Sequence, residues 1–174
     1  MKKHILYPLF LITLLSSISL SSFSQAYKEG DKLLNATIGL NSAYSSGIPL
    51  GASFEVGVSK DISVGGSLDY TSFKYDALDY GWNFLYFGAR GSYHVNELLK
   101  VKNDKLDLYG GLGLGYYTAS FSGLGGTYAG AYSSSLYLTG FIGGRYYFAQ
   151  NVGGVLELGG GGVSNVKLGV TFKF

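Results

Sequence analysis

A serine, a histidine and nearby acids could form a hydrolytic site in this chain. His94 is the one histidine after the first 26 residues, and Ser92 lies two positions before it. In an extended strand, residues two positions apart point to the same face. A serine activated by a histidine and an acid can carry out nucleophilic deacylation. The competing interpretation is that His94 is a structural residue that fills the interior of the fold.

A larger set of charged residues recurs at alternate positions and therefore shares one face of the predicted strands. Charges inside a fold must pair to offset their loss of hydration. We expect Glu157 to lie near Arg145 and Lys167, with Glu55 and Arg90 in the same network. The network would either plug the interior or line a narrow path for water and ions. The candidate members are Glu55, Arg90, Asp107, Arg145, Glu157 and Lys167, with Asp69, His94 and Lys173 on the same face.

Metal and cofactor chemistry has little support in the sequence. There is no cysteine, so thiolate ligands, disulfides and thiol nucleophiles are excluded. A single histidine with scattered carboxylates does not make a transition-metal site. Asp76 and Asp79 are the best candidates for a weak calcium site. We expect no resident metal and no cofactor.

Strands must position these side chains, because the apolar residues repeat with a period of two. From Ser164 to Phe174, every second residue is apolar, and the residues between them are polar or small. This alternation is typical of a strand with one face in an apolar phase. The apolar positions are Val166, Leu168, Val170, Phe172 and Phe174.

The same alternation predicts eight strands. Beyond the N-terminal segment, no run of about 18 apolar residues could span a bilayer as a helix. A sheet in lipid must then close, because an open edge would leave backbone groups unpaired. We therefore predict an all-β fold, an eight-stranded antiparallel up-and-down transmembrane β-barrel. The predicted strands cover about residues 34–44, 50–59, 62–71, 82–95, 105–118, 136–148, 155–159 and 164–174.

Aromatic residues on the apolar face gather at both ends of these strands, as expected for the two interfaces of a bilayer. The alternative fold is a secreted soluble barrel with an apolar interior. Its outer face would consist of the glycine and serine positions, which carry too little charge to solvate a soluble protein. The aromatic residues are Tyr93, Tyr146, Phe148, Phe172 and Phe174 at the end shared with the termini, and Tyr44, Tyr70 and Tyr116 at the other.

Residues 1–26 have the layout of a secretory signal peptide. Two lysines precede a mostly apolar run at 5–15, and a serine-rich run follows it. Cleavage is expected after Ala26 or after Ser24. An N-terminal membrane helix is the alternative, but the apolar run is shorter than the ~20 residues that span a bilayer. The 13 basic residues include the two leader lysines, so 11 basic residues face 11 acidic ones in the barrel domain at 27–174. This neutral domain does not favour nucleic-acid binding.

Four segments beyond the leader carry a resemblance to a known family. They are EGDKLLNATIGL (29–40), DKLDLYGGLGLGYY (104–117), GGRYYF (143–148) and VKLGVTFKF (166–174). With the leader, they resemble the small porin-like outer-membrane β-barrel domains of Gram-negative bacteria, the OmpA/OmpX-like eight-stranded class. The resemblance implies residence in the cell outer membrane, with lipid as a partner. Phe172 and Phe174 are similar to the signal that the outer-membrane assembly machinery reads.

The resemblance is specific for fold and location and much less so for activity. We expect a structural or surface-interaction role with a largely plugged lumen, and a narrow porin for ions or very small solutes is the alternative. An enzyme is not expected, because His94 would lie at the end shared with the termini, whereas a lipid A site belongs in the outer leaflet. The loops at 74–81 and 119–135 would lie outside the cell and could bind an extracellular ligand. Their candidate recognition residues are Tyr75, Tyr80, Phe121, Tyr128 and Tyr132.

Overall fold

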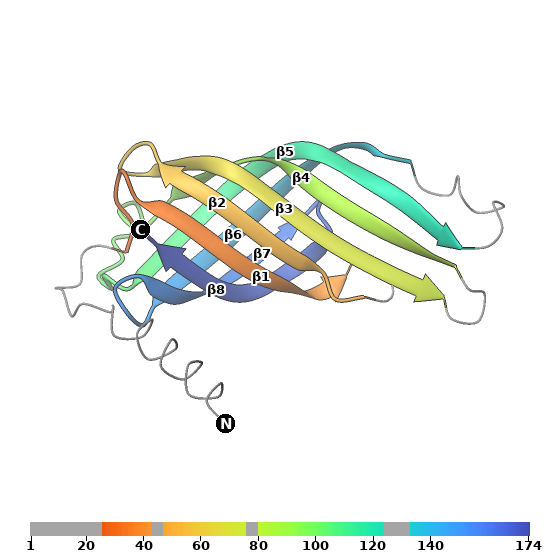
Figure 1. Cartoon of the computed structure of the whole chain (residues 1–174). Helices are drawn as coiled ribbons and strands as arrows, with labels where there is room; N and C mark the ends of the chain where they lie inside the picture. The colour runs from red at the N-terminus through yellow and green to blue at the C-terminus, as the bar shows by residue number, and fades with distance from the viewer. Residues whose placement is uncertain (1–25, 43–46, 76–79, 124–132) are drawn as a thin grey trace, which may run out of the picture.

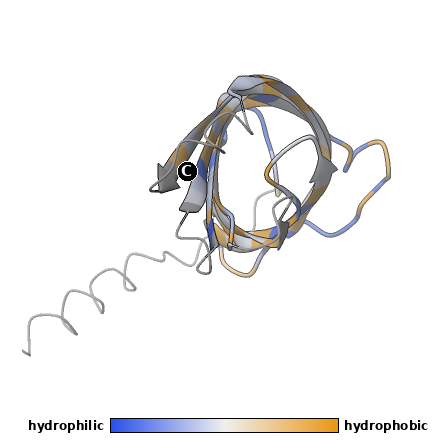
Figure 2. Cartoon of the chain, turned by 90° about the vertical axis from the view of Figure 1, so that its right-hand side faces the viewer, coloured by the Kyte–Doolittle hydropathy of each residue, from blue (hydrophilic) through white to orange (hydrophobic). Residues whose placement is uncertain are grey.

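The protein is a closed barrel. The structure, a computed structural model, describes residues 26–42, 47–75, 80–123 and 133–174. All neighbouring strands are antiparallel, and β1 pairs with β8 to close the sheet (Figures 1 and 2). The predicted eight-stranded up-and-down barrel is confirmed. The strands are β1 (Lys32–Ser42), β2 (Leu50–Gly57), β3 (Ile62–Tyr75), β4 (Tyr80–His94), β5 (Leu106–Gly123), β6 (Ser135–Tyr147), β7 (Val152–Gly160) and β8 (Ser164–Lys173).

Side chains alternate between the outer wall and the lumen, as the period of two predicts. Leu112 and Leu138 on the wall are 66% and 67% exposed, whereas Glu55 and Arg145 in the lumen are fully buried. This distribution is the inverse of that of a soluble barrel and suits an apolar surrounding. Among the described residues, no helix is long and apolar enough to span a membrane.

The two ends of the barrel differ. We call the end with the C-terminus and the turns at 58–61, 95–105 and 148–151 the base, and the opposite end the far end. At the far end, β3, β4 and β5 extend beyond the other strands (Figure 1). Aromatic residues are exposed on the outer wall at the base, and they are Tyr93, Tyr146, Phe148 and Phe174.

The far-end loops were predicted too long. Strand β3 continues to Tyr75 and β4 starts at Tyr80, so only 76–79 separate them instead of the predicted 74–81. Strand β5 continues to Gly123, so Ala119 to Gly123 are part of the wall and not of a loop. Strands β3 and β4 pair without a break up to Tyr75 and Tyr80. Because this pairing continues past Lys74, the polar side chain does not end the strand.

Several sequence predictions fall outside the described residues. The leader at 1–25 is one of them, and its cleavage after Ser24 or Ala26 stays a prediction. The same holds for Tyr44 of the aromatic group, for the calcium candidates Asp76 and Asp79, and for Tyr128 and Tyr132 of the loop.

Glycines let neighbouring strands approach each other closely at particular points of the wall. A Cβ added at Gly169 in β8 would meet the backbone carbonyl oxygen of Ala36 in β1. We call the pairing of these two strands, which closes the barrel, the seam. The close approach at Gly169 therefore lies at the seam. A Cβ at Gly160 in β7 would meet no atom within 4 Å.

Replacing Gly169 with alanine should therefore strain the seam, whereas the same change at Gly160 should be tolerated. We expect Gly169→Ala to destabilise the barrel by roughly 1–3 kcal/mol, the usual cost of overpacking. The measurement is the midpoint of thermal or urea unfolding in detergent micelles, followed by the gel mobility of folded and unfolded protein. Equal midpoints for the two variants would mean that the seam can relax without cost.

Candidate functional site

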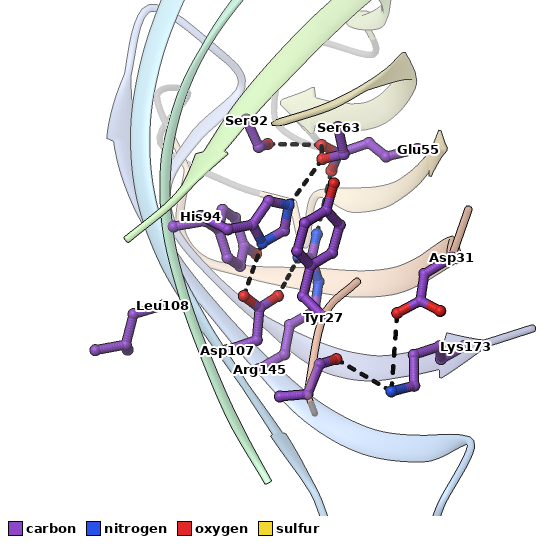
Figure 3. A network of polar contacts seen from close by, with 12 residues as sticks. Tyr27, Asp31, Glu55, Ser63, Ser92, His94, Asp107, Leu108, Arg145 and Lys173 are labelled. Atoms are coloured by element: carbon purple, nitrogen blue, oxygen red, sulfur yellow. Dashed lines mark hydrogen bonds and ion pairs between the residues drawn. The ribbon is translucent and has the colours of Figure 1, made fainter. Parts of the chain in front are cut away.

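The lumen at the base holds six ionisable side chains in which acidic and basic groups alternate. In spatial order they are Glu157, Arg90, Glu55, Arg145, Asp107 and His94, and we call them the charge chain. They come from β2, β4, β5, β6 and β7, so their contacts cross the lumen. Each has at most 7% of its surface exposed. Figure 3 shows the part of the charge chain around His94 and Arg145.

Arg145 on β6 is the centre of the charge chain. Its Nη1 donates to Asp107 Oδ2 at 2.8 Å and its Nη2 donates to Glu55 Oε1 at 3.1 Å. Its Nε donates to Asn35 Oδ1 at 3.2 Å, and the guanidinium carbon lies 3.9 Å from the centre of the Tyr109 ring. A planar guanidinium offers these donors in a fixed fork, so one side chain joins β1, β2 and β5.

Arg90 forms the next link. Its Nη2 donates to Glu157 Oε1 at 2.6 Å, and its Nε lies 3.1 Å from Glu55 Oε1 as an ion pair without the alignment of a hydrogen bond. Tyr109 also donates to Glu157 Oε1, at 2.8 Å. Glu157 is therefore held by a cation and a hydroxyl from two other strands, which offsets the cost of burying its charge.

His94 completes the charge chain and lies in a serine–histidine–aspartate arrangement. Its Nδ1 is 2.7 Å from Asp107 Oδ1, and its Nε2 is 3.0 Å from Ser63 Oγ. The serine is Ser63 on the neighbouring strand β3, not the predicted Ser92. Ser92 instead donates to Glu55 Oε2 at 2.6 Å. These distances are those of a nucleophile, a base and an orienting acid.

Ser63 and Asp107, the two polar partners of His94, have further hydrogen-bond partners in the lumen. Ser63 donates its one hydroxyl hydrogen to Glu55 Oε2 at 2.8 Å. Asp107 accepts from Arg145 Nη1 at 2.8 Å in addition to its contact with His94. Both partners of His94 are therefore also bound to other members of the charge chain.

Residues 26–31, which we call the base segment, cover His94 from below. The Tyr27 ring stacks on the His94 ring at a centroid distance of 3.4 Å and an angle of 5°. Its hydroxyl bonds the carbonyl oxygens of Ser59 at 2.8 Å and Ile62 at 2.6 Å. Burial, with help from nearby carboxylates, raises the pKa of Tyr27 to about 12. The hydroxyl consequently remains a donor across the ordinary pH range.

An ion pair and a hydrogen bond from Lys173 connect the base segment to β8. Lys173 Nζ donates to the carbonyl oxygen of Ala26 at 3.2 Å and lies 3.9 Å from Asp31 Oδ2. Gly30 N donates to the carbonyl oxygen of Gly57 at 3.0 Å. The base segment is therefore fastened to the barrel by side-chain and backbone contacts together.

Towards the far end, the lumen is filled by aromatic rings, which we call the aromatic layer. Trp82 lies 5.3 Å from Phe121 in an edge contact, and Tyr86 lies 4.9 Å from Tyr117 in a stacked one. Phe121, predicted as a loop recognition residue, thus packs inside the wall. The layer consists of Phe73, Trp82, Phe84, Tyr86, Tyr117, Phe121 and Tyr137.

The predicted partners of Glu157 and Lys167 differ from those in the structure. Glu157 and Lys167 lie opposite each other in the β7–β8 register. The Lys167 ammonium nevertheless reaches Asp69 Oδ1 on β3 at 2.6 Å, and Glu157 pairs with Arg90. The structure thus brings five of the six predicted network residues into the charge chain and places Lys167 in a separate pair.

Three contributors were missed from the sequence. Ser63 and Asn35 are uncharged, and their signal was only that they lie in the inward phase of β3 and β1. Tyr27 precedes the first strand, where alternation gives no information. Within the described residues, no group of three or more histidine, cysteine, aspartate or glutamate side chains could hold a metal ion.

Comparisons with known proteins support the fold. No protein-family model matches the chain, and no curated protein matches it. Several solved structures match the chain in fold. Neisserial surface protein A has a TM-score of 0.55 at 22% identity, with 84% of this chain and 98% of that one covered. The outer membrane protein OprG from Pseudomonas aeruginosa has 0.55 at 16%, with 86% and 98% covered. Ail of Yersinia pestis has 0.52 at 18%, with 84% and 99% covered. The chain therefore has the fold of the eight-stranded transmembrane barrels of outer membranes.

Replacing Arg145 with methionine should strongly destabilise the barrel. The change leaves Glu55 and Asp107 buried with one partner fewer, and breaking a buried pair costs about 3–5 kcal/mol. The measurement is unfolding in detergent micelles. The matched control is Lys60→Met, because Lys60 pairs with Glu97 at 2.9 Å on the exposed surface, where little change is expected. Similar small effects in both variants would contradict the central role of Arg145.

Replacing Ser63 with alanine tests the structural interpretation of the histidine site. Glu55 loses one donor, so stability should fall by roughly 1–3 kcal/mol. The purified wild type should not hydrolyse esters or lipid A, and the variant should not differ from it. Hydrolysis by the wild type that disappears in Ser63→Ala would show instead that the triad is catalytic.

Proposed function

We propose that the protein is an outer-membrane β-barrel with a closed lumen and a structural or surface-interaction role. The observation that carries this proposal is the filling of the lumen. The base segment, the charge chain and the aromatic layer follow one another along the barrel axis. An eight-stranded barrel is just wide enough for side chains to fill it, and large inward side chains occupy this one.

The hollow next to the charge chain is too small to serve as a pore. It has a volume of about 30 Å³ and is lined by Tyr137 of the aromatic layer and by Arg90 and Glu157 of the charge chain. This volume has room for one or two water molecules. Ion conduction needs a continuous row of water or coordinating groups, so a closed lumen is favoured over a narrow porin.

The outer wall supports residence in a membrane. Its leucines and phenylalanines are exposed over the whole circumference, and aromatic residues mark the base. We propose that residues 1–26 act as the export signal. We also propose that the last strand, with Phe172 and Phe174 in its apolar phase, is read by the assembly machinery of the outer membrane.

The far end supports a role at the surface. Strands β3, β4 and β5 have 14, 15 and 18 residues. About 9–11 residues are enough to cross a bilayer as a tilted strand. These three strands would therefore project beyond the lipid. We propose that this end faces outward and is the place where an extracellular ligand would bind.

Planar-bilayer conductance of the refolded protein tests the closed lumen. We expect the wild type to give no discrete current steps, because two packed layers block the path. Glu157→Gln keeps the side-chain volume and should be equally silent. The control is Leu158→Ala, the adjacent residue on the lipid-facing wall.

Discrete steps from the wild type that change in Glu157→Gln, but not in Leu158→Ala, would contradict the closed lumen. The protein would then be a narrow porin lined by Glu157 and its partners. Steps that are unaffected by Glu157→Gln would place the leak outside the lumen.

A further inference from the structure

The turn between β4 and β5, residues 95–105, is the longest connection at the base and has an unusual surface. Leu98 and Leu99 are adjacent, and they are 69% and 59% exposed. The other two base turns, at 58–61 and 148–151, have no such pair of leucines. Adjacent exposed leucines on a turn are unfavourable in water and indicate a surface that is covered when the protein is in place.

We propose that this turn is an anchor that binds anionic glycerophospholipid at the bilayer surface. The leucines would enter the apolar boundary of the leaflet, and neighbouring lysines would bind the lipid phosphates. The proposal rests on the membrane location proposed above.

The turn is built to hold the leucines in place. Asn96 fastens both of its ends, because its Nδ2 donates to the carbonyl oxygen of Leu106 and its Oδ1 accepts from Leu108 N. Within the turn, Leu99 N donates to the carbonyl oxygen of Val95 at 2.8 Å. Backbone bonds thus fix the tip, and the leucines are displayed on a rigid frame.

The charges around the leucines favour an anionic partner. Lys100 directly follows Leu99, and Lys102 lies two residues further on; both are exposed and have no ion-pair partner among the described residues. Asp104 lies two residues after Lys102, and Glu97, on the other side of the leucines, forms a hydrogen bond with Lys60 at 2.9 Å. This hydrogen bond raises the pKa of the Lys60 amine. The turn has three lysines (Lys100, Lys102 and Lys105) and two acids (Glu97 and Asp104), so its formal charge is 3 − 2 = +1.

Lys100 also occupies a strained position. Its φ is 52°, in the left-handed region that glycine adopts most easily. A chain with 28 glycines nevertheless has a lysine at this point. A long cationic side chain at a position that favours glycine is consistent with a task for that side chain.

The turn continues a surface that already faces lipid. Tyr93, two residues before the turn, is 45% exposed on the outer wall at the base, where tyrosines mark the membrane interface. A segment that starts at this level can place leucines in the leaflet and lysines among the headgroups. Continuity with the lipid-facing wall therefore favours a phospholipid over a protein partner.

Single-cysteine labelling tests the proposal, because the chain has no cysteine of its own. Leu99→Cys and, as a matched control in the same turn, Asn103→Cys carry an environment-sensitive dye. The proteins are refolded into phosphatidylcholine vesicles with or without about one-third phosphatidylglycerol, and spin-labelled lipids quench the dye. We expect quenching at position 99 to exceed that at 103, and to rise about twofold with phosphatidylglycerol. Lys100→Gln/Lys102→Gln should abolish that rise.

Each contrary result has a separate meaning. A third label at Leu138→Cys reports on the wall, and absence of quenching there would contradict the membrane location itself. Quenching at 138 with equal, weak quenching at 99 and 103 would overturn the anchor. Quenching at 99 that ignores phosphatidylglycerol would overturn the preference for anionic lipid. Disulfide-linked dimers through position 99 would show that a second copy of the chain covers the leucines.

Discussion

A fully buried arginine between two carboxylates is the interaction on which the lumen depends. Arg145 extends from β6 and contacts Asn35 on β1, Glu55 on β2 and Asp107 on β5. Glu55 also lies 3.1 Å from Arg90, and Asp107 lies 2.7 Å from His94, so the charge chain continues on both sides of Arg145. Without Arg145, two carboxylates would remain buried for one arginine and one histidine. The wall gives the barrel its shape, and this cation ties opposite sides of the wall together.

Such large inward groups fit only because the facing positions are empty. In the β5–β6 register, Tyr109 lies opposite Gly143, Phe141 opposite Gly111, and Tyr137 opposite Gly115. A Cβ at each of these glycines would collide with the facing ring. Each ring therefore covers a cross-strand glycine, an arrangement known to stabilise glycine in sheets. The high glycine content thus serves the filling of the lumen as well as the bending of the strands.

The sequence predicts which side chains share the lumen but not which of them meet. Alternation placed Glu55, Arg145 and Glu157 inside, because a period of two is a property of each strand alone. Which charged side chains form ion pairs depends on how far each one extends across the lumen. The order of the strands does not predict that distance. Glu157 and Lys167 are direct neighbours in register, yet each binds a group on a distant strand. The far-end extensions of β3 and β5 were predicted as loops for a different reason. Lys74 and the serines of β5 interrupt the apolar alternation there, whereas the backbone pairing of the strands continues.

Ser63, His94 and Asp107 have the spacing of a catalytic triad, yet Ser63 also binds a carboxylate of the lumen. A catalytic serine must direct its hydroxyl hydrogen at the histidine. Here the buried carboxylate of Glu55 accepts that hydrogen at 2.8 Å, and Asp107 accepts from Arg145 as well as contacting His94. Tyr27 then covers the His94 ring with its own ring. Because the polar side chains of the interior bind one another, the contacts with other molecules proposed above lie on the lipid-facing wall and at the two ends.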